Sequence, residues 1–222
     1  MLFRSGTSND PGTAAGDSGD ASGTGDIQGK GVGKAQFGCN VYYKSKQPMP
    51  ALARSGRLTP DIRLSDNYIL SNFTKCRVEN YDVGQIRPYK RDGKTWFGVW
   101  DIVQNYRCIA LNILEPLREV YPGFVINSGY RHTTSAHAYA AVDLQWPNYA
   151  SNRKKMLEIA KYCAERFSPD QILLETKNRS TAWLHIGYCY YNGQQRNMHA
   201  TGLQTSGGMK LLSPNWKQFV PW

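Results

Sequence analysis

Two histidines and one aspartate have the residue types of a catalytic zinc site. The chain of 222 residues holds four histidines, and His137 is followed six residues later by Asp143, with His185 far downstream. Two imidazoles and one carboxylate that leave a coordination position open form a ligand set for metal-assisted hydrolysis. Composition alone leaves a second interpretation open, in which the three are ordinary surface residues. The residues around them favour the metal site.

Five short segments surround these residues in a characteristic order. They are SGYR at 128–131, SAH at 135–137, AVDL at 141–144, DQILLE at 170–175 and WLHI at 183–186. Together they resemble the zinc D-Ala-D-Ala carboxypeptidase (LAS-type) family of peptidoglycan peptidases, which shares its core with lysostaphin-type and hedgehog domains. The resemblance extends upstream to LSDNYILSNFT at 64–74 and NILEPLR at 112–118, and so covers about residues 64–190.

The resemblance implies a metal site and a base. His137, Asp143 and His185 would bind Zn²⁺, and Glu175 would be the general base that takes a proton from water. The implied reaction is metal-assisted hydrolysis of an amide bond. Some relatives place the acid three residues before the last histidine. That position is Ala182 here, so Glu175 is the candidate, with a plain strand-end carboxylate as its alternative.

The resemblance also implies substrate-binding residues. Arg131 would pair with a substrate carboxylate, for which a planar guanidinium suits bidentate binding. Ser135 would support the first ligand or the substrate, and Trp183 would be a substrate contact or a wall of the cleft. Of the other histidines, His132 is expected in an exposed loop or lining the cleft, and His199 is expected to be structural or exposed.

One departure from the family pattern concerns the first two ligands. The family has seven residues from the histidine to the aspartate, whereas His137 and Asp143 are six apart, and Tyr139-Ala140 replaces the usual glycine. In a strand, a deletion of one residue turns a side chain to the other face unless a turn or bulge absorbs it. Either the zinc site is rebuilt here, or it is lost in a domain kept for binding.

The elements that must position these residues predict an α+β fold. Apolar periodicity indicates helices at 101–120 and 151–167 and strands at 124–128, 171–175 and 182–187. Asp101 is the expected N-cap of the first helix, and Pro116 is expected to kink or break it. We therefore expect a small antiparallel sheet with flanking helices.

The composition divides the chain into four parts. Ten of the 21 glycines fall within residues 1–38, which argues for an extended Gly/Ser-rich arm. Such a segment cannot bury enough apolar surface to order itself, so we expect a flexible tether if the chain is alone. We favour a larger assembly, in which the arm lies on a neighbouring protein. The parts are the arm at 1–36, a connector at 37–63, the peptidase-like domain at 64–190 with an insertion at 77–100, and an extension at 191–222.

The charge distribution points to an anionic partner. Residues 1–38 carry −1 of the net +10, so the remaining residues carry +11. A basic domain attracts nucleic acid or an anionic surface such as bacterial peptidoglycan. Aromatic residues lie beside lysines in Tyr42-Tyr43-Lys44 and Tyr89-Lys90, but no nucleic-acid motif accompanies them, so nucleic acid is disfavoured as the partner.

The start of the chain bears on location. No apolar run reaches the roughly 18 residues of a membrane span, and the first residues lack the apolar core of a signal peptide. Without export, a wall peptidase is expected in a phage, in the virion or in the host cytoplasm before assembly or lysis. The arm favours a tail or baseplate component that aids wall penetration, its arm binding other tail proteins. A free endolysin and an inactive wall-binding module are the alternatives.

The five cysteines offer no further metal site. They form no C-x-x-C pair, so we expect buried free thiols rather than a zinc ribbon or a disulfide framework.

Overall fold

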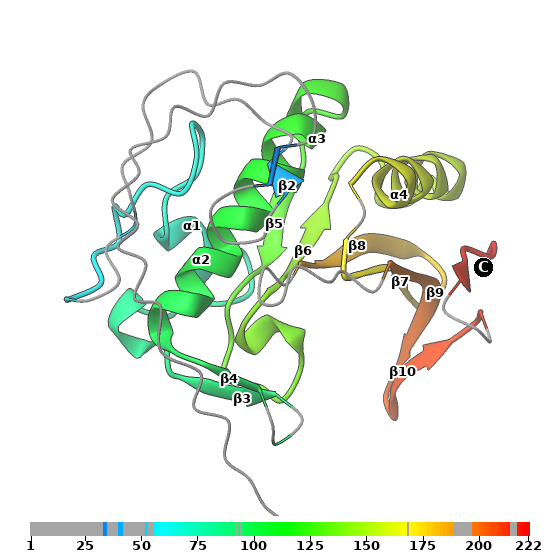
Figure 1. Cartoon of the computed structure of the whole chain (residues 1–222). Coiled ribbons are helices and arrows are strands. Elements are labelled where there is room, and N and C mark those ends of the chain that lie inside the picture. The colour runs from blue at the N-terminus through cyan, green and yellow to red at the C-terminus, as the bar shows by residue number, and fades with distance from the viewer. Residues whose placement is uncertain are drawn as a thin grey trace, which may run out of the picture.

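The computed structural model describes residues 33–34, 40–41, 52, 56–91, 93, 95–167, 169–188, 197–213 and 217–222. Most of the expected arm and much of the connector lie outside these residues, as do Asp92 and Lys94 of the insertion. Figure 1 shows a central sheet accompanied by a long helical unit and a second helix. The fold is α+β, as the sequence predicts.

The main sheet has seven strands and is mixed. It contains β5 (Val125–Ser128), β6 (Ala141–Gln145), β7 (Gln171–Lys177), β8 (Thr181–Gly187), β9 (Met198–Thr205), β10 (Gly208–Leu211) and β11 (Lys217–Gln218). The order is β10-β9-β7-β8-β6-β5, and β11 pairs with β9. The expected antiparallel arrangement holds from β5 to β7, but β9 joins β7 in parallel. The residues after 196 thus enlarge the sheet beyond the small one expected (Figure 1).

The first long helix consists of three consecutive segments. They are α2 (Val99–Ile109), the π-helical η2 (Ala110–Leu114) and α3 (Glu115–Val120). The helix begins two residues before the predicted start, because Gly98 is its N-cap and Asp101 accepts the Gly98 amide N–H at 2.8 Å from the third helical position. Pro116 lies in the first turn of α3 instead of ending the helix. Proline has no amide N–H to donate to the helical hydrogen bonds. The π-helical segment before it changes the spacing of these backbone hydrogen bonds, so the helix continues through Pro116.

The second helix, α4 (Arg153–Phe167), buries the apolar stripe predicted for it, which includes Met156, Ile159 and Cys163. It packs on β7 and β8 and also contacts η2, so the helical units lie together against the sheet. On that side the strands present fully buried Leu144, Leu184 and other aliphatic residues. Because strand side chains alternate, the next residues along these strands face the opposite side.

The insertion at 77–100 is ordered around a hairpin. It contains η1 (Val83–Gln85), β3 (Tyr89–Arg91) and β4 (Thr95–Phe97), and Gly93 between the two strands adopts φ +66°. Tyr89 and Phe97 stack on Tyr139, with ring centroids 5.2 and 4.8 Å away. The hairpin thereby supports the segment that follows His137.

Four short elements complete the description. They are β1 (Gly33–Lys34), β2 (Asn40–Val41), α1 (Ser71–Thr74) and the 3₁₀ turn η3 (Ala136–Ala138). α1 lies within the segment 64–74, which carries part of the resemblance. Among the described residues, no helix has both the length and the apolar character that crossing a membrane requires.

The expectation of free thiols is wrong for one cysteine. Cys163 is a buried free thiol and Cys76 a half-buried one, but Cys108 on α2 is disulfide-bonded. Cys39 and Cys189 lie outside the described residues. A spacing rule based on C-x-x-C pairs does not detect a disulfide between cysteines that only the fold brings together.

Candidate metal centre

The three residues predicted as metal ligands meet in a buried cluster. His137 Nε2 lies 3.1 Å from Asp143 Oδ1 and 3.1 Å from His185 Nδ1, and the last two atoms are 2.9 Å apart. Asp143 on β6 and His185 on β8 are direct antiparallel neighbours, while His137 comes from η3. All three side chains are buried and can hold a metal ion together.

The short spacing between the first two ligands is absorbed by a turn. His137 occupies a 3₁₀ turn, and β6 begins only at Ala141, so strand alternation does not set its direction. The Ala140 amide closes the turn by donating to the Ala136 carbonyl at 2.7 Å. The missing residue therefore does not turn His137 away from Asp143.

Hydrogen bonds fix the orientation and tautomer of His137. Its Nδ1 lies 2.8 Å from the carbonyl oxygen of Gly129, which can only accept, so Nδ1 carries the proton. Nε2 then directs a lone pair at Asp143 and His185. The His137 carbonyl also accepts a hydrogen bond from the buried Tyr106 hydroxyl at 2.9 Å. A backbone carbonyl that orients a ligating imidazole in this way is the usual outer support of a metal-binding histidine.

The donor set fits a zinc ion. Ligand atoms about 2.0–2.1 Å from a tetrahedral zinc lie roughly 3.3 Å apart, close to the 2.9–3.1 Å separations found here. Two imidazole nitrogens favour zinc over magnesium and calcium, which prefer oxygen ligands. Without a cation between them, the lone pairs of His137 and the Asp143 carboxylate would repel each other.

The protonation states suit metal binding. Burial lowers the pKa of His137, so this imidazole is neutral. Burial alone would raise the pKa of Asp143, but the two imidazoles outweigh it and hold the pKa below its usual value. Burial lowers the pKa of His185, yet hydrogen bonding and attraction to Asp143 raise it overall. In the metal-free protein a proton on His185 therefore occupies the place of a cation, and a metal ion must displace it.

A second layer of charge supports Asp143. Arg131 Nη2 lies 3.5 Å from Asp143 Oδ2, and its Nη1 lies 4.0 Å from Oε1 of the buried Glu79. Glu79 is held in turn by hydrogen bonds from the Ser128 hydroxyl at 2.7 Å and the Cys76 thiol at 2.9 Å. The Arg131 side chain remains 37% exposed. It therefore contacts a predicted metal ligand and still reaches the surface.

Glu175 lies on the same face of the sheet as His185. It is the antiparallel neighbour of Trp183 on β8 and the parallel neighbour of Gly202 on β9, and Leu173 two residues earlier pairs with His185. Burial raises the pKa of Glu175 to about 7, with His185 acting against this shift and Asp143 adding to it. Trp183 is half-buried and forms a hydrogen bond that lowers this pKa.

The remaining predicted residues lie at the margin of the cluster. Ser135 is exposed at the start of η3, where its carbonyl accepts the Ala138 amide at 3.0 Å. The His132 ring is exposed and its Nε2 lies 2.8 Å from the Gln85 carbonyl. His199 on β9 packs against Phe219. Neither His132 nor His199 belongs to the metal-ligand group found in the described residues.

Sequence reasoning missed three residues that support the site. Gly129 was part of a recognised segment, but its carbonyl role was not foreseen. Tyr106 offered the weak signal of a polar group on the apolar side of a helix, where it is fully buried. Glu79 carried no signal, because its importance arises only from its contacts with Ser128 and Arg131.

Comparisons of the chain with models of protein families, with curated proteins and with solved structures find no match.

Proposed function

We propose that the protein is a zinc-dependent peptidase that hydrolyses peptide bonds of bacterial peptidoglycan, on a domain of the D-Ala-D-Ala carboxypeptidase type. One observation carries the proposal: His137 Nε2, Asp143 Oδ1 and His185 Nδ1 converge within 3.1 Å of one another, with Glu175 on the same sheet face. Each of the five segments between residues 128 and 186 that resemble the family contributes a residue to this neighbourhood.

His137, Asp143 and His185 would hold the zinc ion. When bound, zinc supplies Lewis-acid polarisation of a carbonyl and acidifies water. Glu175 would take the proton from the attacking water and return it to the leaving amine. A pKa of about 7 suits this work, because a base is most effective when its pKa lies near the working pH.

Arg131 would contact both the metal ligand Asp143 and the substrate. Its Nη2 approaches the Asp143 oxygen that faces away from His137, and the exposed part of its guanidinium can pair with a substrate carboxylate. Trp183, the strand neighbour of Glu175, would border the bound peptide. Ser135, exposed at the start of η3, would contact the substrate rather than the metal ligands.

The wider setting we propose is a phage tail or baseplate, in which the domain cuts the wall locally. The support is compositional: a Gly-rich segment at 1–38 with a charge of −1 precedes a remainder of +11 that suits an anionic wall.

Hydrolysis of purified peptidoglycan by the zinc-loaded protein tests the proposal, with release of free amino groups as the readout. We expect activity that is lost on chelation, in His137→Ala and in Glu175→Gln, and kept in the control His199→Ala. Zinc binding and wall binding without hydrolysis would instead identify an inactive wall-binding module. Salt-sensitive DNA binding without wall binding would contradict both the peptidase and the wall-binding module.

A further inference from the structure

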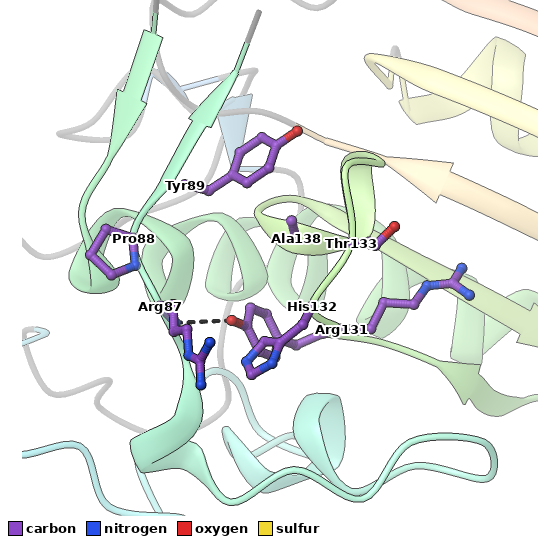
Figure 2. A pocket seen from close by; sticks show the side chains of 8 residues that line it. Arg87, Pro88, Tyr89, Arg131, His132, Thr133 and Ala138 are labelled. Atoms are coloured by element: carbon purple, nitrogen blue, oxygen red, sulfur yellow. Dashed lines mark hydrogen bonds between the residues drawn. The ribbon is translucent and has the colours of Figure 1, made fainter. Parts of the chain in front are cut away.

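A second site lies beside the candidate metal centre. A pocket of about 170 Å³ opens between the insertion and the loop that follows β5 (Figure 2). Its walls include Arg87, Pro88 and Tyr89 from the insertion, and Tyr130, His132 and Thr133 from the loop. None of these six residues belongs to the metal-ligand group found in the described residues.

Hydrogen bonds tie the two walls together. The Arg87 amide donates to the Tyr130 hydroxyl at 2.9 Å, and the Tyr89 hydroxyl donates to the Thr134 carbonyl at 2.9 Å. His132 Nε2 lies 2.8 Å from the Gln85 carbonyl, which joins the loop to η1. Three links between segments more than 40 residues apart preform the pocket, so a ligand would not have to order it.

The lining is cationic and contains no acidic residue. Arg87 is exposed, and the ion pairs found among the described residues leave it without a carboxylate partner. Arg131 also borders the pocket, but Figure 2 shows its side chain pointing away from Arg87, in keeping with its contacts to Asp143 and Glu79. Arg87 is thus the guanidinium available to a ligand, and His132 offers its second ring nitrogen.

The position of the pocket links it to the metal centre. Tyr130 follows Gly129, whose carbonyl orients His137, and the lining residue Ala138 follows His137 itself. Consecutive residues are about 3.8 Å apart, so a peptide crossing the metal centre reaches the pocket within a few residues. The Pro88 ring and the half-buried Tyr89 ring, one face of which stacks on Tyr139, suit the aliphatic part of such a peptide.

We infer that this pocket is a substrate subsite that binds a carboxylate of the wall peptide on Arg87, separate from any carboxylate held by Arg131. The inference rests on the proposed function and adds the substrate chemistry: a peptide with two acidic groups near the cleaved bond, each with its own arginine. Carboxylates pair with guanidinium groups through charged hydrogen bonds, which are stronger than neutral ones.

Direct binding to the zinc-loaded Glu175→Gln variant tests this without turnover. The probes are a synthetic wall pentapeptide with a free D-glutamate α-carboxylate, the same peptide amidated at that carboxylate, and the same peptide amidated at its C-terminus. We expect Arg87→Gln to weaken binding of the doubly acidic peptide about tenfold, and Arg87→Lys to restore part of it. For one of the two amidated peptides, Arg87→Gln should have no further effect.

Lys90→Gln is the matched control, because it removes the same charge from the same insertion at a residue outside the pocket. Equal weakening by Lys90→Gln and Arg87→Gln would overturn the inference, as would an Arg87 effect that persists with both amidated peptides. If none of the peptides binds zinc-loaded Glu175→Gln, the proposed function fails together with the inference. If the peptides bind equally well with and without Arg87→Gln, only the inference is overturned.

Discussion

The carbonyl oxygen of Gly129 lies 2.8 Å from Nδ1 of His137, and this contact aims the other ring nitrogen at the candidate metal position. Gly129 is itself fixed by α1. A Cβ atom built on it would lie 2.2 Å from the Phe73 carbonyl oxygen, and the next amide, that of Tyr130, donates to the same oxygen at 2.7 Å. The SNFT segment far upstream thus sets the direction of a ligand through one glycine.

Gly129→Ala should therefore damage both the fold and the metal centre. The new methyl group meets backbone, which cannot move aside cheaply, so we expect a loss of stability of about 2–4 kcal/mol. Displacing the Gly129 carbonyl should also weaken zinc binding about 10–100-fold, as expected for loss of an outer support. Chemical denaturation and a competitive metal titration measure the two effects.

Gly84→Ala is the control for this substitution. Gly84 lies in η1 with no atom within 4 Å of the added Cβ, so its stability and metal affinity should stay near those of the wild type. A Gly129→Ala variant as stable as Gly84→Ala would show that α1 does not restrain the ligand.

The metal centre should bind one equivalent of zinc and stabilise the fold. At a free zinc concentration 100 times Kd, the gain in unfolding free energy is about 2.7 kcal/mol. His137→Ala should abolish the gain, whereas His199→Ala, on a strand outside the ligand group, should keep it. Affinity should fall as the pH is lowered through the raised pKa of His185, because a proton then competes for Nδ1. Thermal unfolding measures the gain in stability, and calorimetric titration at several pH values measures the zinc affinity. Unchanged zinc binding in His137→Ala would contradict the assignment of this metal centre.

Glu175 should lower the stability of the metal-free protein at neutral pH. Its pKa rises from 4.5 to about 7 on folding, chiefly through burial, so between these values the unfolded chain ionises while the folded one does not. Stability is unaffected below pH 4.5, falls as the pH rises to 7, and is then lower by about 3 kcal/mol. Glu175→Gln lacks this titration and should be the more stable protein above pH 7.

The measurement is denaturant unfolding of the wild type and of Glu175→Gln, both freed of metal by a chelator, from pH 4 to pH 8. The readout is the difference between their free energies of unfolding, because Asp143 and the histidines titrate in both proteins. A difference that stays constant with pH would mean that Glu175 ionises normally, and would weaken its assignment as a base.

The sequence could predict the residues of this centre but not their supports. The segments around His137, Asp143 and His185 are local patterns, and the buried stripe of α4 follows from helical periodicity. The parallel pairing of β9 with β7 joins residues far apart in the chain, and no local pattern encodes that choice. The role of Glu79 is likewise absent from its surroundings in sequence, because it exists only where the insertion meets Ser128 at the end of β5.

Arg131 and its buried partner provide the sharpest test of that second layer. Because Arg131 Nη2 contacts Asp143 Oδ2 at 3.5 Å, Arg131→Gln should weaken zinc binding about tenfold or more, in addition to raising KM through loss of a substrate contact. Glu79→Gln keeps an acceptor for the Ser128 hydroxyl but removes the charge beside Arg131. It should therefore reproduce part of the loss of zinc affinity while leaving KM near that of the wild type.

Arg77→Gln is the control, since Arg77 Nη1 contacts Gln145 on β6 at 2.7 Å rather than Asp143. An Arg131→Gln variant with raised KM and unchanged zinc affinity would assign the guanidinium to substrate alone.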